Sequence, residues 1–223
     1  RHKVQAIDYG LDFYAPQTTL SPDGRRIMVA WMQSWATANH DPAHRPWFGR
    51  MTLPRELSVR DGRLYQQPGR ELQGMWRDTA LLRGVKVEEP TALPGIGGRS
   101  LDLTVTVHTA QSPACRRFTL RFAADDVLYN EIRCDIDRGE LAFDRSHGGS
   151  RRDIPHTRHI KAEPRDGKLT LRLILDKDCA ELFVNDGERA LSAVLDTPLP
   201  AGKIFFAADG GPACLDVVQH HLG

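Results

Sequence analysis

The chain has 223 residues, of which 40% are hydrophobic and 26% charged, and 30 Lys and Arg against 29 Asp and Glu leave a net charge of +1. This composition is typical of a folded globular protein and excludes a disordered chain. There is no basic excess to neutralise a phosphate backbone and no apolar run of the ~20 residues needed to span a bilayer, so neither nucleic acid nor a membrane is an expected partner.

The first part of the chain, residues 1–72, contains a few aromatic-rich segments with the character of strands. We expect strands at 5–7, 13–19 and 26–31, followed by a long polar loop over residues 36–46. Three or four strands with two apolar faces form a sheet that cannot bury both faces by itself. The segment therefore predicts one blade of a β-propeller.

A seam follows near residues 73–78, and residues 73–223 then show about nine short segments with apolar and polar residues in alternation. Alternation of period two predicts half-buried antiparallel strands; the clearest cover residues 100–108, 117–122, 131–136 and 168–176. Tripeptides ending in Asp-Gly at residues 22–24, 60–62, 165–167 and 185–187 predict the turns. No stretch of ten residues has helical periodicity. The chain is predicted to be all-β.

Chemistry-bearing motifs of other protein classes are missing. The four cysteines are widely spaced, which argues against a zinc ribbon and a disulfide scaffold and favours free thiols and the cytoplasm. His40 and His44 are four residues apart, but Pro42 and Pro46 disfavour a helix and a third ligand is lacking, so no metal is expected. No nucleotide-binding fingerprint is present, and no cofactor is expected.

Five runs of sequence carry a family resemblance. They are DYGLDFYAPQT at residues 8–18, RRIMVAWMQSW at 25–35, MTLPREL at 51–57, ELAFDRS at 140–146 and ELFVNDGE at 181–188. In this order they resemble the C-terminal part of glycoside hydrolase family 32, which includes invertases, sucrose-6-phosphate hydrolases, levanases and inulinases. The resemblance implies the last blade of a five-bladed β-propeller followed by a C-terminal antiparallel β-sandwich.

The family's catalytic carboxylates lie in WMNDPN-like, RDP and EC motifs, and none of these occurs in this sequence. The resemblance therefore implies that the catalytic residues lie outside this chain, upstream of Arg1. The chain alone should be inactive, and its implied partners are a fructoside substrate and an N-terminal propeller half. The sandwich would stabilise the propeller and serve as an oligomer contact.

Four residues are expected to form part of the fructose pocket. By resemblance, residues 13–18 form the innermost strand of the blade, which brings Asp12 and Tyr14 to the sugar, while Trp31 and Trp35 offer flat apolar walls. Structural roles compete for Asp12, and core packing competes for Tyr14 and Trp31. Asp8 and Asp12 cannot be the catalytic pair, because four residues of strand would separate them by ~13 Å.

Two other functions remain open. One is a non-catalytic fructan- or carbohydrate-binding module, although residues 100–223 contain no Trp and only one Tyr, Tyr129, for stacking on sugars. The other is a split enzyme in which this chain complements a separate N-terminal half. Neither the particular fructoside nor the preference for hydrolysis over transfer follows from these residues.

Overall fold

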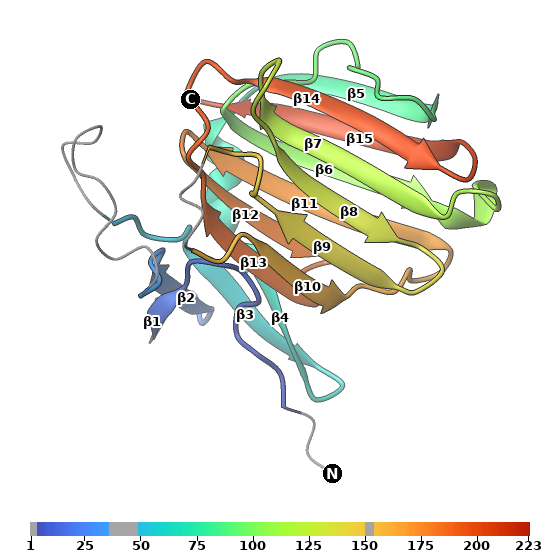
Figure 1. Ribbon diagram of the computed structural model, residues 1–223. Coiled ribbons are helices and arrows are strands. Elements are labelled where there is room, and N and C mark those ends of the chain that lie inside the picture. The colour runs from blue at the N-terminus through green and yellow to red at the C-terminus, as the bar shows by residue number, and fades with distance from the viewer. Residues whose placement is uncertain (1–3, 36–48, 150–153) are drawn as a thin grey trace.

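A computed structural model describes residues 4–35, 49–149 and 154–223 and shows an all-β protein made of three antiparallel sheets (Figure 1). The first sheet is a four-stranded meander in chain order, and we call it the blade. Its strands are β1 (Tyr14–Leu20), β2 (Arg26–Trp31), β3 (Arg55–Arg60) and β4 (Arg63–Pro68). A short 3-10 helix, η2 (Arg70–Met75), connects the blade to the rest of the chain.

The other two sheets form a sandwich. The six-stranded sheet has the order β13-β12-β11-β6-β15-β5 and consists of β5 (Trp76–Val87), β6 (Ser100–His108), β11 (Lys168–Asp176), β12 (Cys179–Val184), β13 (Arg189–Val194) and β15 (Ala213–Leu222). The five-stranded sheet has the order β10-β9-β8-β7-β14 and consists of β7 (Arg117–Ala124), β8 (Asn130–Asp135), β9 (Glu140–Asp144), β10 (Thr157–Lys161) and β14 (Lys203–Asp209). A second 3-10 helix, η3 (Thr109–Gln111), follows β6.

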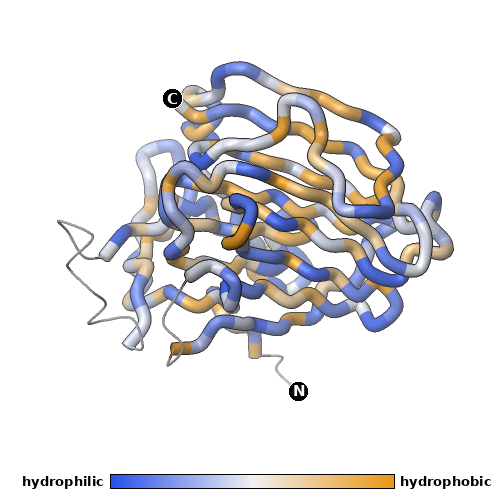
Figure 2. Tube along the Cα trace, turned by 45° about the horizontal axis from the view of Figure 1, so that its top comes forward, coloured by the Kyte–Doolittle hydropathy of each residue, from blue (hydrophilic) through white to orange (hydrophobic). Residues whose placement is uncertain are grey.

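Alternating side chains build the core between these two sheets. Leu103 of β6 lies opposite Leu173 of β11, and both are fully buried, as are Phe118 and Phe206 from the facing sheet. Hydrophobic and hydrophilic residues alternate along the strands in Figure 2. Because one face of each strand packs inward, the period-two pattern of the sequence becomes a two-layer core. The prediction of strands at residues 100–108 and 168–176 is confirmed.

The Asp-Gly tripeptides form turns as predicted. Asp61 and Gly62 join β3 to β4 with φ angles of 49° and 71°. Positive φ at both central residues defines the two-residue hairpin turn whose twist matches that of the flanking strands. Asp166 and Gly167 have the same signs, at 49° and 74°.

Three details differ from the expectations. Residues 5–7 form no strand, and the first strand begins at Tyr14. The described residues after residue 75 contain eleven strands, β5 to β15, rather than about nine. One of them is β10, a strand with basic side chains in which only Ile160 is buried, so its sequence lacks the alternation of apolar and polar residues that predicts a strand.

Within the described ranges, no helix is long and apolar enough to cross a membrane.

The blade packs beside the edge of the six-stranded sheet that ends in β13 (Figure 1). A backbone hydrogen bond from Gln66 of β4 to the carbonyl of Gly187 spans 3.0 Å across this junction. The two modules therefore form a continuous body joined near β4, β12 and β13. The number of blades stays a prediction, because residues 4–35 and 49–149 supply one such sheet.

Candidate functional site

Three aromatic side chains gather at the free edge of the blade. Tyr14 begins β1 and lies opposite Trp31 at the end of β2, and the ring of Trp35 is 5.6 Å from that of Tyr14 at an angle of 69°. Exposed fractions are 44% for Tyr14, 39% for Trp31 and 81% for Trp35. We call these three residues the aromatic edge. They offer apolar ring surface to whatever lies next to β1.

Asp12, the fourth predicted site residue, lies elsewhere. It is fully buried, and its carboxylate accepts hydrogen bonds from Arg145 of the sandwich at 2.5 Å and from the backbone N–H of Val194 at 2.9 Å. The structure thus brings together three of the four residues and places Asp12 between blade and sandwich. Ionic contact with a buried arginine fixes the chain immediately before β1.

The residues preceding β1 run along the edge of β13. The backbone N–H of Tyr9 donates to the carbonyl of Ala190, and those of Leu11 and Asp12 donate to the carbonyl of Ser192, at 2.8 to 3.1 Å. A Cβ on Gly10 would overlap the backbone of Ser192, so only glycine fits here. We call residues 8–12 the edge strap. It covers an edge strand that would otherwise present unpaired backbone groups.

Asp8 belongs to this strap rather than to a strand. Its carboxylate accepts hydrogen bonds from the N–H of Gly10 at 2.7 Å and from the hydroxyl of Ser192 at 2.8 Å. Residues 8–12 contain bends, so Asp8 and Asp12 do not have the ~13 Å separation expected for an extended strand. Their carboxylates bind the backbone of the strap and residues of the sandwich instead.

A single arginine lies at the centre of the junction. Arg55 of β3 is fully buried and uses all five of its N–H donors. Its acceptors are Glu181 at 2.6 and 2.9 Å, Asp8 at 2.9 Å, Gln66 at 3.0 Å and Ser192 at 2.6 Å. We call Arg55, Asp8 and Glu181, with their polar neighbours, the arginine clamp. It ties β3 and the edge strap to β12 and β13.

The charge balance of the clamp is negative, because two buried carboxylates share one guanidinium. Loss of solvent raises the pKa of Asp8 and of Glu181 above their ordinary values, and Arg55 offsets part of the effect. The rings of Phe13 and Phe183 lie 5.3 and 5.2 Å from the guanidinium carbon and help to exclude water. The side chains of Arg55, Asp8 and Glu181 are 0%, 1% and 5% exposed, so the clamp is a buried, tightly bonded joint that offers little surface to a substrate.

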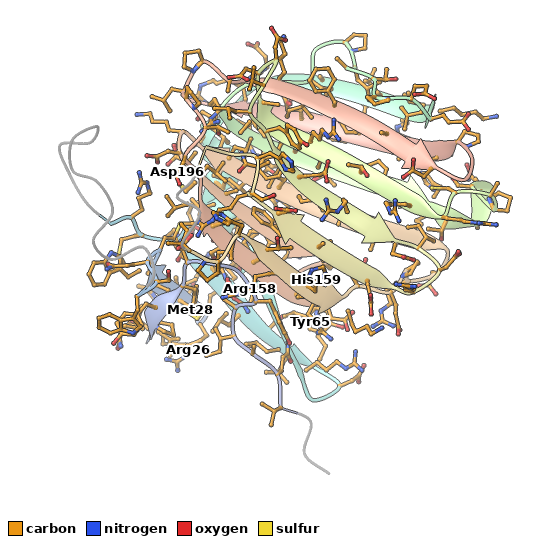
Figure 3. The ribbon with its side chains drawn as sticks, viewed as in Figure 1. Arg26, Met28, Tyr65, Arg158, His159 and Asp196 are labelled. Atoms are coloured by element: carbon orange, nitrogen blue, oxygen red, sulfur yellow. The ribbon has the colours of Figure 1, made fainter. Side chains whose placement is uncertain are left out.

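Two further contacts reinforce the junction. Arg50 forms an ion pair with Asp178 at the start of the β12 region. Arg158 of β10, labelled in Figure 3, donates to the carbonyl of Gly10 at 3.1 Å. These contacts come from both sheets of the sandwich, so the junction is held from several sides.

The clamp partners were not found as such from the sequence. Arg55 and Glu181 lie inside the quoted runs MTLPREL and ELFVNDGE, but 126 residues separate them and neither run signals a pairing. The aromatic edge had a signal in the sequence, since Tyr14 and Trp31 lie within two predicted strands and Trp35 follows the second. His40 and His44, considered above as metal ligands, lie outside the described residues.

The blade, the strap and the sandwich together define a class: a two-module all-β protein in which a propeller-type sheet is bonded to a β-sandwich through buried charges. Comparisons with known proteins agree. The family model described as glycosyl hydrolases family 32 N-terminal domain matches residues 1–68, and the one described as glycosyl hydrolases family 32 C terminal matches residues 76–219. The chain belongs to glycosyl hydrolase family 32.

Relatives in this family are considerably longer. The chain is 34% identical over 217 residues to a raffinose invertase of Escherichia coli, covering 95% of this chain and 42% of that protein. Among solved structures, the chain is similar to an exo-inulinase from Aspergillus awamori, with a TM-score of 0.82 and 20% identity. The match covers 97% of this chain and 44% of the inulinase chain. A sucrose-6-phosphate hydrolase from Lactobacillus gasseri gives a TM-score of 0.82 at 21% identity, over 97% and 42%. The chain thus spans less than half of these relatives.

Proposed function

We propose that this chain is the C-terminal part of a β-fructofuranosidase-like glycoside hydrolase that removes terminal β-fructofuranosyl units from sucrose or fructans. The observation that carries the proposal is the aromatic edge, whose three exposed rings lie on β1, on β2 and just after β2. The family resemblance supports a position for this edge beside the sugar. Membership of the family and the names of the relatives support the reaction class.

The aromatic edge would form one wall of the fructose pocket. Tyr14 presents a ring and a hydroxyl, and Trp31 and Trp35 each present an indole with one N–H donor. Their exposure, 81% for Trp35, leaves ring surface for the apolar face of a sugar. The rest of the pocket would come from other blades of the propeller.

For Asp12 we propose a positioning role. Its carboxylate is occupied by Arg145 and by the N–H of Val194, so it holds the chain two residues before Tyr14 rather than contacting sugar. The sandwich would in this way set the position of the pocket wall.

The chemistry itself would come from carboxyl groups outside this chain. A retaining glycosidase needs two carboxyl groups about 5–5.5 Å apart, one as nucleophile and one as acid/base. Of the acids at the junction, Asp8, Asp12 and Glu181 are all buried in ion pairs with arginine. The chain alone should therefore be inactive, and an N-terminal propeller half is its proposed partner.

Complementation tests the proposal. The chain is assayed for sucrose and 1-kestose hydrolysis alone, and again after co-expression with the N-terminal part of the E. coli raffinose invertase, its relative at 34% identity. We expect no hydrolysis alone and measurable hydrolysis in the complex, with Tyr14→Ala and Trp35→Ala raising KM. The matched control is Tyr65→Ala, in β4 away from the aromatic edge.

Hydrolysis by the isolated chain would contradict the placement of the catalytic carboxylates. A co-purifying complex that cleaves neither sugar would contradict the fructosidase assignment. Unchanged KM in both aromatic variants would contradict the pocket wall.

A further inference from the structure

A second candidate site lies at the other edge of the blade. A cavity of about 270 Å³ opens between β4 and η2 and the outer face of the six-stranded sheet. The blade order β1-β2-β3-β4 puts this cavity beyond β4, whereas the aromatic edge is at β1. Two interstrand spacings from Trp31 of β2 and three from Tyr14 of β1 alone separate the aromatic edge from β4 by about 10 to 14 Å. The cavity is thus distinct from the proposed fructose pocket.

One wall of the cavity is a rigid assembly of aromatic and charged groups. The rings of Trp76 and His220 stack at 3.8 Å with an angle of 6°. The indole N–H donates to Asp102 at 3.1 Å, and Arg172 binds the same carboxylate with two hydrogen bonds of 2.7 and 3.0 Å. The stacking on His220 and the hydrogen bond to Asp102 together set the orientation of the Trp76 ring before any ligand binds. The stacked imidazole covers only one face of the indole.

Other polar groups of the cavity are unused. The hydroxyls of Thr104 and Thr170 and the side-chain amide of Gln73 line it and have no hydrogen-bond partner among the residues that the structure describes. Thr104 and Thr170 lie diagonally on one sheet face, because Thr104 of β6 is paired with Arg172 of β11 and Thr170 with Thr106. An array of neutral donors and acceptors next to an aromatic ring has the composition of a site for a polyhydroxy ligand.

The charge of the cavity excludes an anion as the preferred occupant. Arg172 is neutralised by Asp102, and Asp186 adds a further negative charge. The volume lies near the small end of the ~300–1,000 Å³ range of ligand sites, which fits one sugar unit rather than a chain.

We propose that this cavity is a non-catalytic saccharide site that holds one neutral sugar unit against Trp76. That the sugar is a fructosyl unit rests on the proposed function. The aromatic ring comes from Trp76, at the start of β5, which is why the lack of Trp in residues 100–223 does not exclude sugar binding by the sandwich. Such a site would retain a fructan while its end is cleaved elsewhere.

Titration of the 223-residue chain with 1-kestose, followed through the indole N–H resonance of Trp76, tests the proposal. The resonance is assigned with a Trp76→Phe variant, and cellotriose and inorganic phosphate serve as comparison ligands. We expect a saturable shift with 1-kestose, and the double variant Thr104→Val/Thr170→Val should weaken binding at least roughly fivefold through loss of hydrogen bonds. The matched control is Thr106→Val, on the same strand and face but outside the cavity.

Three results would overturn the proposal. One is the absence of a saturable shift with either sugar, and another is binding by the double variant as tight as that of Thr106→Val. Displacement of the sugar by phosphate would contradict the neutral ligand. Binding of cellotriose alone would keep the saccharide site and refute the fructosyl assignment. The complementation assay is read separately, so loss of hydrolysis with binding retained refutes only the proposed function.

Discussion

Replacing Arg55 with methionine is expected to destabilise the folded chain severely. Methionine keeps most of the volume but removes five hydrogen bonds and leaves Asp8 and Glu181 buried without a counter-charge. Removing one partner from a buried ion pair costs about 3–5 kcal/mol, because the remaining charge has lost its solvent and its partner. We expect a loss of that size in the free energy of unfolding at neutral pH.

The loss should depend on pH in a defined direction. The pKa values of Asp8 and Glu181 are already raised above 3.8 and 4.5, and without Arg55 they rise further. A carboxyl with a raised pKa binds more protons in the folded than in the unfolded state, so stability falls as pH rises from the ordinary to the raised pKa. The destabilisation by Arg55→Met should therefore shrink as pH is lowered from neutral toward about 4.

Urea unfolding followed by tryptophan fluorescence at several pH values measures both effects. Arg60→Met is the matched control, since Arg60 ends the same strand but is exposed over Tyr65, and its loss should stay below about 1 kcal/mol. Arg55→Lys tests the fork geometry, because the three donors of an ammonium group cannot replace five hydrogen bonds to four acceptor residues. A loss for Arg55→Met as small as that of the control, or one that does not change with pH, would refute the account of the clamp.

Two further predictions follow from the strap and from a partly exposed thiol. Gly10→Ala should destabilise the chain by about 3 kcal/mol in the same urea assay, because the added Cβ overlaps the backbone of Ser192. The control Gly74→Ala has open space around it and should change the free energy of unfolding by less than about 0.5 kcal/mol. Similar values for the two variants would show that the strap does not depend on the close approach of Gly10 to Ser192. Burial raises the pKa of the Cys179 thiol to about 12, so only about one thiol in ten thousand is ionised at pH 8. A thiol-specific reagent should therefore modify Cys179 only after the chain is denatured. Rapid labelling of Cys179 in the folded chain, located by peptide mass spectrometry, would contradict this prediction.

The sandwich strands were predictable because their pattern is local. Leu101 to Val107 alternate with polar residues over a whole strand, and Asp61-Gly62 specify a two-residue turn by backbone sterics alone. Both the alternation and the turn sequence can be recognised without knowing which strand is the partner.

The junction was not predictable in the same way. Asp8 and Asp12 sit in a segment that resembles a strand in composition, but the backbone bends to reach β13, a partner about 180 residues later in the chain. The four residues that accept hydrogen bonds from Arg55 come from four separate segments. A carboxylate or an arginine can have either a catalytic or a structural role, and its burial and its partners decide which. Burial and partners depend on the fold, so the sequence alone does not distinguish the two roles.

The edge strap also bears on where genes of this kind can be divided. A cut near residue 73, at the visible border between blade and sandwich, would free Glu181 from Arg55 and uncover β13. An exposed, unpaired strand edge is a template for aggregation. Recombination between relatives, or a deliberate division into two polypeptides, should therefore succeed when the break falls before Asp8, so that strap, blade and sandwich are inherited together.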